Sequence, residues 1–177
     1  MIDQASVLPA VGFPPIAAAD ARLLILGTLP SPQSLRAGRY YAHPRNAFWP
    51  IIATLCALPA EADDAQRKSA LLARRIALWD VCRCAVRPGS GDAAIVADTV
   101  IANDFDTFFA THTGIERLLF NGQPAARLWR RHVWPKLASR WQTLPSTVLP
   151  STSPAHAGIS QAEKMARWLA ALAVTET

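Results

Sequence analysis

Short apolar runs alternate along the chain with longer segments in which apolar residues recur at helical spacing. Four runs have the length and composition of buried strands: 22–27, 76–81, 117–120 and 147–149. The longer segments predict helices over 47–58, 60–75, 123–137 and 161–174, and a shorter helix that begins near Asn103 or Asp104. Strands that alternate with helices are typical of a parallel sheet with both faces covered. The pattern therefore predicts an α/β fold built on four parallel strands.

Nothing along the chain indicates a second domain. The 177 residues contain no internal repeat and have the length of one compact unit, so we expect 1–177 to form a single domain. Pro9, Pro14 and Pro15 favour an extended N-terminal arm over 1–21 that packs on this domain. Hydrophobic residues make up 51% of the chain and charged residues 18%, a composition that excludes a disordered protein.

The loops that follow the predicted strands hold most of the polar residues that need an explanation. In parallel α/β sheets, ligands bind outside the carboxyl ends of the strands. This rule selects four segments for the functional site: 27–46, 82–92, 121–124 and 150–156. We expect them to meet at one edge of the sheet.

Several kinds of site are excluded by what the chain lacks. Segment 27–31 follows the first strand but lacks the further glycines of a dinucleotide fingerprint, and no Walker sequence occurs. The three cysteines, Cys56, Cys82 and Cys84, lack the spacing of a zinc or iron–sulfur site, and Cys82 and Cys84 are expected to pack on one face of a strand. We therefore expect no cofactor and no metal.

The sequence also predicts a protein of the reducing cytoplasm without a membrane partner. The longest charge-free apolar run, 48–60, is too short to span a bilayer and contains Pro50 and Pro59. The N-terminus lacks the basic and then apolar pattern of a secretion signal. A cytoplasmic protein is the expectation.

The charge balance permits a polyanionic partner but does not establish one. Eighteen Lys and Arg residues against 13 Asp and Glu residues give a formal net charge of +5. Four basic residues of segment 123–137 are expected to form the solvated face of an amphipathic helix: Arg127, Arg130, Arg131 and Lys136. Arg36, Arg39 and Arg45 lie nearer the predicted site and are better candidates for phosphate contacts.

Segment 40–49, Tyr-Tyr-Ala-His-Pro-Arg-Asn-Ala-Phe-Trp, combines aromatic residues with an Arg and an Asn at the start of a predicted helix. Asn46 has two interpretations, as the cap of that helix or as a residue of the site. The adjacent tyrosines either pack at a rim or stack on a planar ligand such as a nucleobase. Asp80 and Asp92 are candidate general bases, although we expect Asp80 to accept hydrogen bonds from backbone donors at its strand end.

Seven short motifs occur in the same order as in the uracil-DNA glycosylase superfamily, and they resemble most closely its hypoxanthine-DNA (deoxyinosine) glycosylase branch. They are 27–31 (Gly-Thr-Leu-Pro-Ser), 40–49, 77–81 (Ala-Leu-Trp-Asp-Val), 87–90 (Arg-Pro-Gly-Ser), 103–105 (Asn-Asp-Phe), 120–122 (Phe-Asn-Gly) and 149–155 (Leu-Pro-Ser-Thr-Ser-Pro-Ala). The resemblance covers about residues 22–170. It implies a three-layer αβα sandwich around a four-stranded parallel sheet, no metal, and hydrolysis of the bond between a damaged base and deoxyribose.

The resemblance also implies roles for single residues. Leu29 stands where related branches carry an acidic or amide residue, so the task of holding the attacking water moves to Asn46. Tyr41 matches the aromatic residue that stacks on the flipped base. Asn121 matches the side chain that reads the edge of the base. The backbone of two further residues is expected to contact the same base: Gly27 and Thr28.

Segment 151–156 resembles the family's loop that presses into the minor groove and fills the gap left by the extruded base. The residues expected to contact DNA are Ser31, Arg45, Ser151, Thr152, Ser153, Pro154 and His156. His156 departs from the Asn or small residue expected at its position and is kept outside the catalytic set. The implied partner is damaged double-stranded DNA with a flipped base, bound by a monomer.

The resulting prediction is a monofunctional DNA glycosylase of base excision repair that removes chiefly hypoxanthine and also uracil. A mismatch-type uracil or thymine glycosylase of the same fold is an alternative. A catalytically silent nucleic-acid-binding module would bind DNA without releasing a base. A hydrolase of free nucleosides would show little dependence on salt, whereas binding through DNA phosphates weakens steeply as salt rises.

Overall fold

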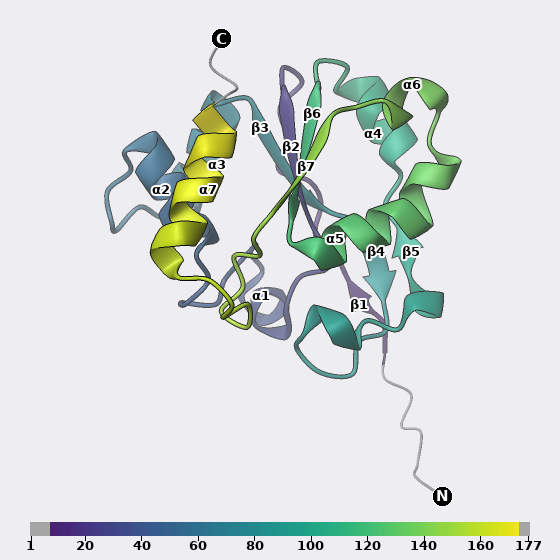
Figure 1. Cartoon of the computed structure of the whole chain (residues 1–177), viewed down its shortest axis with the longest axis horizontal. Coiled ribbons are helices and arrows are strands. Elements are labelled where there is room, and N and C mark those ends of the chain that lie inside the picture. Colours follow the sequence, from purple (N-terminus) through teal and green to yellow (C-terminus); the bar gives the residue numbers. More distant parts are fainter. Residues whose placement is uncertain (1–7, 174–177) are drawn as a thin grey trace, which may run out of the picture.

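A four-stranded parallel sheet forms the centre of the molecule (Figure 1), in a computed structural model that describes residues 8–173. Its strands are β2 (Leu23–Gly27), β3 (Ile76–Asp80), β6 (Arg117–Asn121) and β7 (Ser146–Leu149), in the spatial order β3-β2-β6-β7. β2 pairs in parallel with β3 and β6, and β6 pairs in parallel with β7. The predicted α/β fold with four parallel strands is confirmed.

Alternate side chains of β2 point into two separate apolar cores. Leu24 and Leu26 lie in a core with side chains of α4 (Phe105–Thr111) and α5 (Gln123–Leu128). Leu23 and Ile25 lie in a second core, which they share with α2 (Phe48–Cys56), α3 (Asp64–Ala73) and α7 (Gln161–Ala173). The two sets of helices cover opposite faces of the sheet (Figure 1), so the molecule is a three-layer αβα sandwich.

Local capping decides where one predicted helix begins. α3 starts at Asp64 and not near residue 60, because Asp63 and Gln66 form a capping box. The side chain of each accepts a hydrogen bond of 2.8 Å from the backbone N–H of the other. These two bonds satisfy donors that the first turn of a helix otherwise leaves free.

The helix predicted over 123–137 changes type along its length. It is α-helical only to Leu128 and continues as a π-helical turn, Trp129–Val133, and a 3-10 turn, Trp134–Lys136. Pro135 cannot donate a backbone hydrogen bond, which prevents a regular α-helical ladder there. The four basic residues predicted to face solvent are all exposed: Arg127, Arg130, Arg131 and Lys136.

A small antiparallel sheet beside the main one was not predicted. It contains β1 (Ala10–Val11), β4 (Cys82–Ala85) and β5 (Ile101–Ala102), with β4 in the middle. Two of these strands have only two residues, too few to show a periodic pattern in the sequence. Cys82 is buried in this region and Cys84 is partly buried, and both are free thiols.

Short helical turns fill several connections that the sequence analysis left as loops. They are α1 (Pro32–Ala37), α6 (Ser139–Gln142) and the 3-10 turns η1 (Asp92–Ala94) and η2 (Ala97–Thr99). Ser31 caps α1, because its hydroxyl accepts a hydrogen bond from Ser34 N–H at 3.1 Å. α1 lies within the first of the four site segments and shapes the entrance to the site.

The described part of the N-terminal arm runs along the edge of both sheets. Ile16 and Leu78 exchange two backbone hydrogen bonds, which attach the arm to β3. The carbonyl of Phe13 accepts a hydrogen bond from Trp79 Nε1 at 3.1 Å. Residues 1–7 of the predicted arm lie outside the described residues. No helix within 8–173 is long and apolar enough to cross a membrane.

Candidate active site

A cleft of about 820 Å³ opens where the strands of the main sheet end. β2, β3, β6 and β7 end at Gly27, Asp80, Asn121 and Leu149, and all four residues line the cleft. Each of the four segments selected from the sequence contributes lining residues. Arg167 of α7 also lines the cleft, and the sequence analysis did not include it. The expectation that the loops meet at one edge of the sheet is confirmed.

Tyr41 lies in the cleft with its ring packed on Phe48, the two ring centroids being 4.2 Å apart. Its φ of +51° is in the left-handed region, which costs a residue with a side chain about 1–3 kcal/mol. Its neighbours hold it there, since Trp49 Nε1 donates to the Tyr40 carbonyl at 2.7 Å and the Tyr40 hydroxyl donates to the arm. The Tyr41 hydroxyl is buried without a hydrogen-bond partner among the described residues. Burial raises its pKa, so Tyr41 is a neutral phenol.

Asn46 combines the two interpretations that the sequence left open. Its Oδ1 accepts a hydrogen bond from Phe48 N–H at 3.0 Å, which satisfies the first backbone donor of α2, although the N-cap position itself is Ala47. It also lines the cleft, and its Nδ2 has no hydrogen-bond partner within residues 8–173. The capping bond fixes the orientation of the amide and leaves Oδ1 with a second lone pair. The role of Asn46 toward water stays a prediction.

Asn121 is buried at the end of β6 and is bonded to the loop that follows β7. Its Nδ2 donates to Thr152 Oγ1 at 2.9 Å, and its Oδ1 accepts from Thr152 N–H at 2.8 Å. One N–H and one lone pair of the amide remain, which is enough to bond the edge of a base. Thr152 is completely buried, so its side chain anchors the loop, and its predicted contact with DNA stays a prediction.

Residues 150–156, hereafter the anchored loop, are fastened by three further donors. Each donates to a backbone carbonyl of the loop. Ala47 N–H donates to the carbonyl of Thr152 (3.0 Å), Lys164 Nζ to that of Ser153 (3.0 Å) and Trp168 Nε1 to that of Pro150 (2.8 Å). Lys164 is only 2% exposed, and burial lowers its pKa. The sequence analysis missed Lys164 and Trp168, because a Lys or Trp in an amphipathic helix gives no signal of what it contacts.

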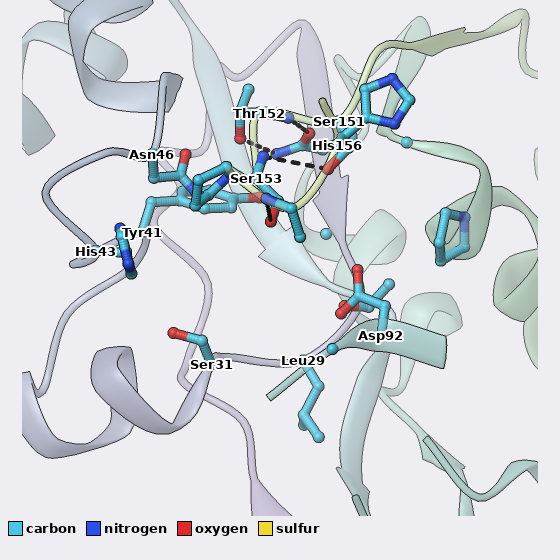
Figure 2. Close-up of a pocket in the computed structure, with 18 of the residues that line it drawn as sticks. Leu29, Ser31, Tyr41, His43, Asn46, Asp92, Ser151, Thr152, Ser153 and His156 are labelled. Atoms are coloured by element: carbon cyan, nitrogen blue, oxygen red, sulfur yellow. Dashed lines mark hydrogen bonds between the residues drawn. The ribbon is translucent and has the colours of Figure 1, made fainter. Parts of the chain in front are cut away.

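The other residues of the anchored loop remain available at its surface. Ser151, Ser153 and Pro154 are partly exposed, and His156 is exposed. All four line the cleft, and the ring of His156 lies across the loop from Asn46 (Figure 2). Their predicted contacts with DNA stay predictions.

Two glycines allow close approaches that a side chain would block. A Cβ on Gly122, whose φ is +94°, would lie 2.9 Å from Ser151 Cβ, so this glycine lets the anchored loop pack against the end of β6. A Cβ on Gly27 would lie 2.3 Å from Asp80 Oδ1 and 2.8 Å from Tyr41 Oη. The carbonyl of Gly27 accepts from Val81 N–H at 3.0 Å, which joins β2 to the residue after β3.

The side of the cleft opposite the anchored loop carries three ionisable side chains: Asp80, Arg87 and Asp92. Together with Thr28, they are hereafter called the acid wall. Thr28 Oγ1 donates to Asp92 Oδ1 at 2.7 Å. Arg87 is 6% exposed and donates to the carbonyls of Leu29 and Pro30, at 3.3 and 2.6 Å. These bonds hold the turn that follows β2. Burial lowers the pKa of Arg87, while the two carboxyl groups oppose that shift.

The Asp80 side chain was predicted to accept hydrogen bonds from backbone donors at its strand end, and the structure differs from this prediction. Its Oδ2 is buried without a hydrogen bond from any described residue, so its side chain does not satisfy backbone donors at that atom. The strand end is instead secured by Asn103, whose Nδ2 donates to the Asp80 carbonyl at 2.7 Å. Burial raises the pKa of the Asp80 side chain to about 8, and the charge of Asp92 adds to that shift. Asp80 is therefore a neutral acid near pH 7.

The remaining predicted residues are divided between the cleft and its surroundings. Leu29 is 5% exposed and packs with Cys82 and Ala85, and its side chain points away from Tyr41 and Asn46 (Figure 2). Two residues predicted to contact DNA line the cleft: Ser31, which caps α1, and Arg45, which is exposed. Arg36 and Arg39 are exposed but do not line it. Among residues 8–173, no group of three or more His, Cys, Asp or Glu side chains could hold a metal ion.

Comparisons with known proteins agree with this architecture. The family model of the uracil DNA glycosylase superfamily matches residues 14–173. A hypoxanthine DNA glycosylase of Methanosarcina barkeri is 34% identical over 113 residues, which are 63% of this chain and 70% of the relative. A hypoxanthine DNA glycosylase of Methanosarcina acetivorans is 31% identical over 151 residues, which are 85% of this chain and 90% of the relative. A solution NMR structure from M. acetivorans, provisionally described as a uracil DNA glycosylase, superimposes with a TM-score of 0.78 at 29% identity and covers 96% of this chain and 100% of its own.

Proposed function

The chain belongs to the uracil DNA glycosylase superfamily and is a DNA glycosylase, and from this premise we propose that it acts in base excision repair as a monofunctional enzyme that releases chiefly hypoxanthine and also uracil. The observation that carries the proposal is that one cleft holds Tyr41, Asn46 and Asn121 together. The activity named for the two relatives supports hypoxanthine as the chief substrate.

The cleft suits a base that has left the double helix. An enzyme reaches the glycosidic bond only after the target nucleotide rotates out of the stack into a pocket. The volume of about 820 Å³ is in the range of sites that bind small planar molecules. Tyr41, supported from behind by Phe48, offers its ring to the base. The anchored loop lies beside it, where it can occupy the gap in the DNA.

Asn46 is placed to hold the water that attacks the sugar. Hydrolysis breaks the bond between C1′ and the base, the bonding electrons leave with the base, and the water oxygen forms the new bond to C1′. Phe48 N–H fixes the Asn46 amide, whose free lone pair accepts a hydrogen bond from the water. The remaining N–H of Asn121 donates to the base as negative charge develops on it.

The position of Lys164 supports a monofunctional enzyme. A glycosylase that also cuts the DNA strand uses an amine to attack C1′ and forms a Schiff base. Lys164 Nζ is bonded to the Ser153 carbonyl, and the residue is 2% exposed. It is therefore held in the framework and not offered to the sugar.

The proposal is tested with end-labelled duplexes that carry one deoxyinosine, one deoxyuridine or no damaged base. We expect the deoxyinosine strand to be cut only after hot alkali, faster than the deoxyuridine strand, and the undamaged duplex to stay intact. Cutting before alkali would contradict a monofunctional mechanism, and faster release of uracil would favour the uracil-directed alternative. Binding without base release by folded protein would instead indicate a silent DNA-binding module.

A further inference from the structure

Asp80 is a buried polar side chain of the cleft that the reaction described above does not use. It is 3% exposed, it lines the cleft, and its Oδ2 has no hydrogen bond with any described residue. A buried polar atom without a partner costs about 1–3 kcal/mol. Such an atom beside a ligand cleft indicates that its partner belongs to the ligand.

The geometry around Gly27 shows that the Asp80 carboxyl group lies beside Tyr41. The point 2.3 Å from Asp80 Oδ1 and 2.8 Å from Tyr41 Oη is the position that a Cβ on Gly27 would take. The Tyr41 hydroxyl is also buried without a partner. The Asp80 carboxyl group and the Tyr41 hydroxyl therefore lie next to each other beside Gly27, which lines the cleft. The residue expected to stack on the base and the unpartnered carboxyl are thus neighbours.

The surrounding charges decide which carboxyl group of the acid wall keeps its proton. The titratable groups that act on Asp80 are Asp92 of η1, Arg87 of the loop before it, Cys82 of β4, and Tyr40 and Tyr41 of the loop before α2. Arg87 supplies one positive charge for two carboxyl groups. Burial raises the pKa of Asp92 as well, but the hydrogen bond from Thr28 and the charge of Arg87 oppose that shift by stabilising the ionised form. Asp80 lacks such a donor and is the group that remains protonated.

We propose that Asp80 is a catalytic general acid that gives its proton to a purine base in the cleft, an inference that rests on the function proposed above. Hypoxanthine in DNA has ring nitrogens that can accept a proton, whereas uracil has only its two carbonyl oxygens as acceptors. As the bond between C1′ and the base breaks, its electrons pass to the base and the Asp80 proton neutralises the resulting charge. Water adds its hydroxyl group to C1′ and releases a proton to solvent, from which the Asp80 carboxylate is protonated again.

The test compares Asp80→Asn with the unmodified enzyme on deoxyinosine and deoxyuridine duplexes under single-turnover conditions. Asn keeps the shape of Asp and can donate a hydrogen bond, but it cannot transfer a proton. We expect release of hypoxanthine to fall by about 100-fold, a typical contribution of general acid catalysis. Release of uracil should change by less than about threefold, because uracil has no ring nitrogen to protonate.

The pH profile of the unmodified enzyme provides a measurement that does not depend on a variant. Because the pKa of Asp80 is raised to about 8, the acid form is present below that pH and is lost above it. We expect hypoxanthine release to decline as the pH rises through about 8 and uracil release to lack that decline. In Asp80→Asn, the remaining hypoxanthine release should lose the same decline. Asp98→Asn is the matched control, since Asp98 is exposed, pairs with Arg131 and does not line the cleft.

The outcomes separate this inference from the proposed function. If the unmodified enzyme releases neither base, the proposed function is wrong. If it releases both and Asp80→Asn keeps the full hypoxanthine rate and the same pH profile, only the acid role of Asp80 is overturned. An equal loss on both substrates would assign Asp80 a structural role and would also overturn the inference.

Discussion

The two sides of the cleft differ in whether their buried polar groups have hydrogen-bond partners. In the anchored loop, Thr152 is bonded at its hydroxyl oxygen, its N–H and its carbonyl, and buried Lys164 is bonded to Ser153. In the acid wall, Asp80 Oδ2 and Arg87 Nε are buried without partners among the described residues. A satisfied network makes a rigid framework, whereas an incomplete one is costly to the fold. From this comparison we infer a positioning role toward DNA for the anchored loop and a role toward the base for the acid wall.

The largest expected effect on stability comes from replacing the buried carboxyl group of Asp80 with an amide that does not titrate. Folded Asp80 stays protonated up to about pH 8, whereas the unfolded chain ionises it above about pH 4. Between these values the folded state holds one more proton, so this group lowers the free energy of unfolding by up to about 1.4 kcal/mol for each pH unit of rise. We expect Asp80→Asn to be the more stable protein, increasingly so up to about pH 8. Urea unfolding at several pH values checks this, and equal pH dependence of the two proteins would contradict it.

The next effect is expected at Asn46, in the loop before α2. Asn46→Ala removes the amide that we propose holds the water, and we expect base release to fall by about 10²–10³-fold. The loss of the cap on α2 should cost only about 0.5–2 kcal/mol, and DNA affinity should stay nearly unchanged. Single-turnover rates together with binding to an uncleavable duplex separate these effects. Near-normal turnover in folded Asn46→Ala would show that another group holds the water.

A smaller effect is expected at the anchored loop. Asn121→Ala removes both hydrogen bonds to Thr152 and leaves the buried hydroxyl and N–H of that residue without partners, at a cost of about 1–3 kcal/mol. The ranking of hypoxanthine and uracil should also change, because the edge of the base loses a donor. Thermal unfolding and release rates on both duplexes measure the two results. An unchanged ranking would assign base reading to the backbone around Gly27.

The smallest effect is expected for Lys164→Met. The variant loses one hydrogen bond to the Ser153 carbonyl but no longer buries a cation, so stability should change by less than about 1 kcal/mol. Release of both bases should fall by the same factor, because the loop that docks DNA is less firmly held. Lys136→Met, at an exposed position outside the cleft, is the control for the loss of positive charge. A change in the ranking of bases would contradict a purely positioning role for Lys164.

Strands with long apolar runs could be predicted from the sequence, and very short strands could not. β2 and β3 are buried along their whole length, so their sequences carry a clear strand signal. β1 and β5 have two residues each, and pairing with β4 across a long separation in sequence creates them. The first residue of α3 is set by the reciprocal hydrogen bonds of Asp63 and Gln66. Such bonds shift the start of a helix without changing the spacing of its apolar residues, so the apolar pattern does not reveal them.

By itself, the sequence determined the order of the four buried strands, the edge of the sheet where the site lies, and the polar residues brought to it. Burial pattern and connectivity are sufficient for these, because the carboxyl ends of parallel strands meet at one edge. Only the tertiary structure decided which polar groups find partners. It bound Thr152 to Asn121, Lys164 to Ser153 and Arg87 to the turn after β2. It also left Asp80 without a partner at Oδ2, because burial and hydrogen bonding depend on distances between residues far apart in the chain.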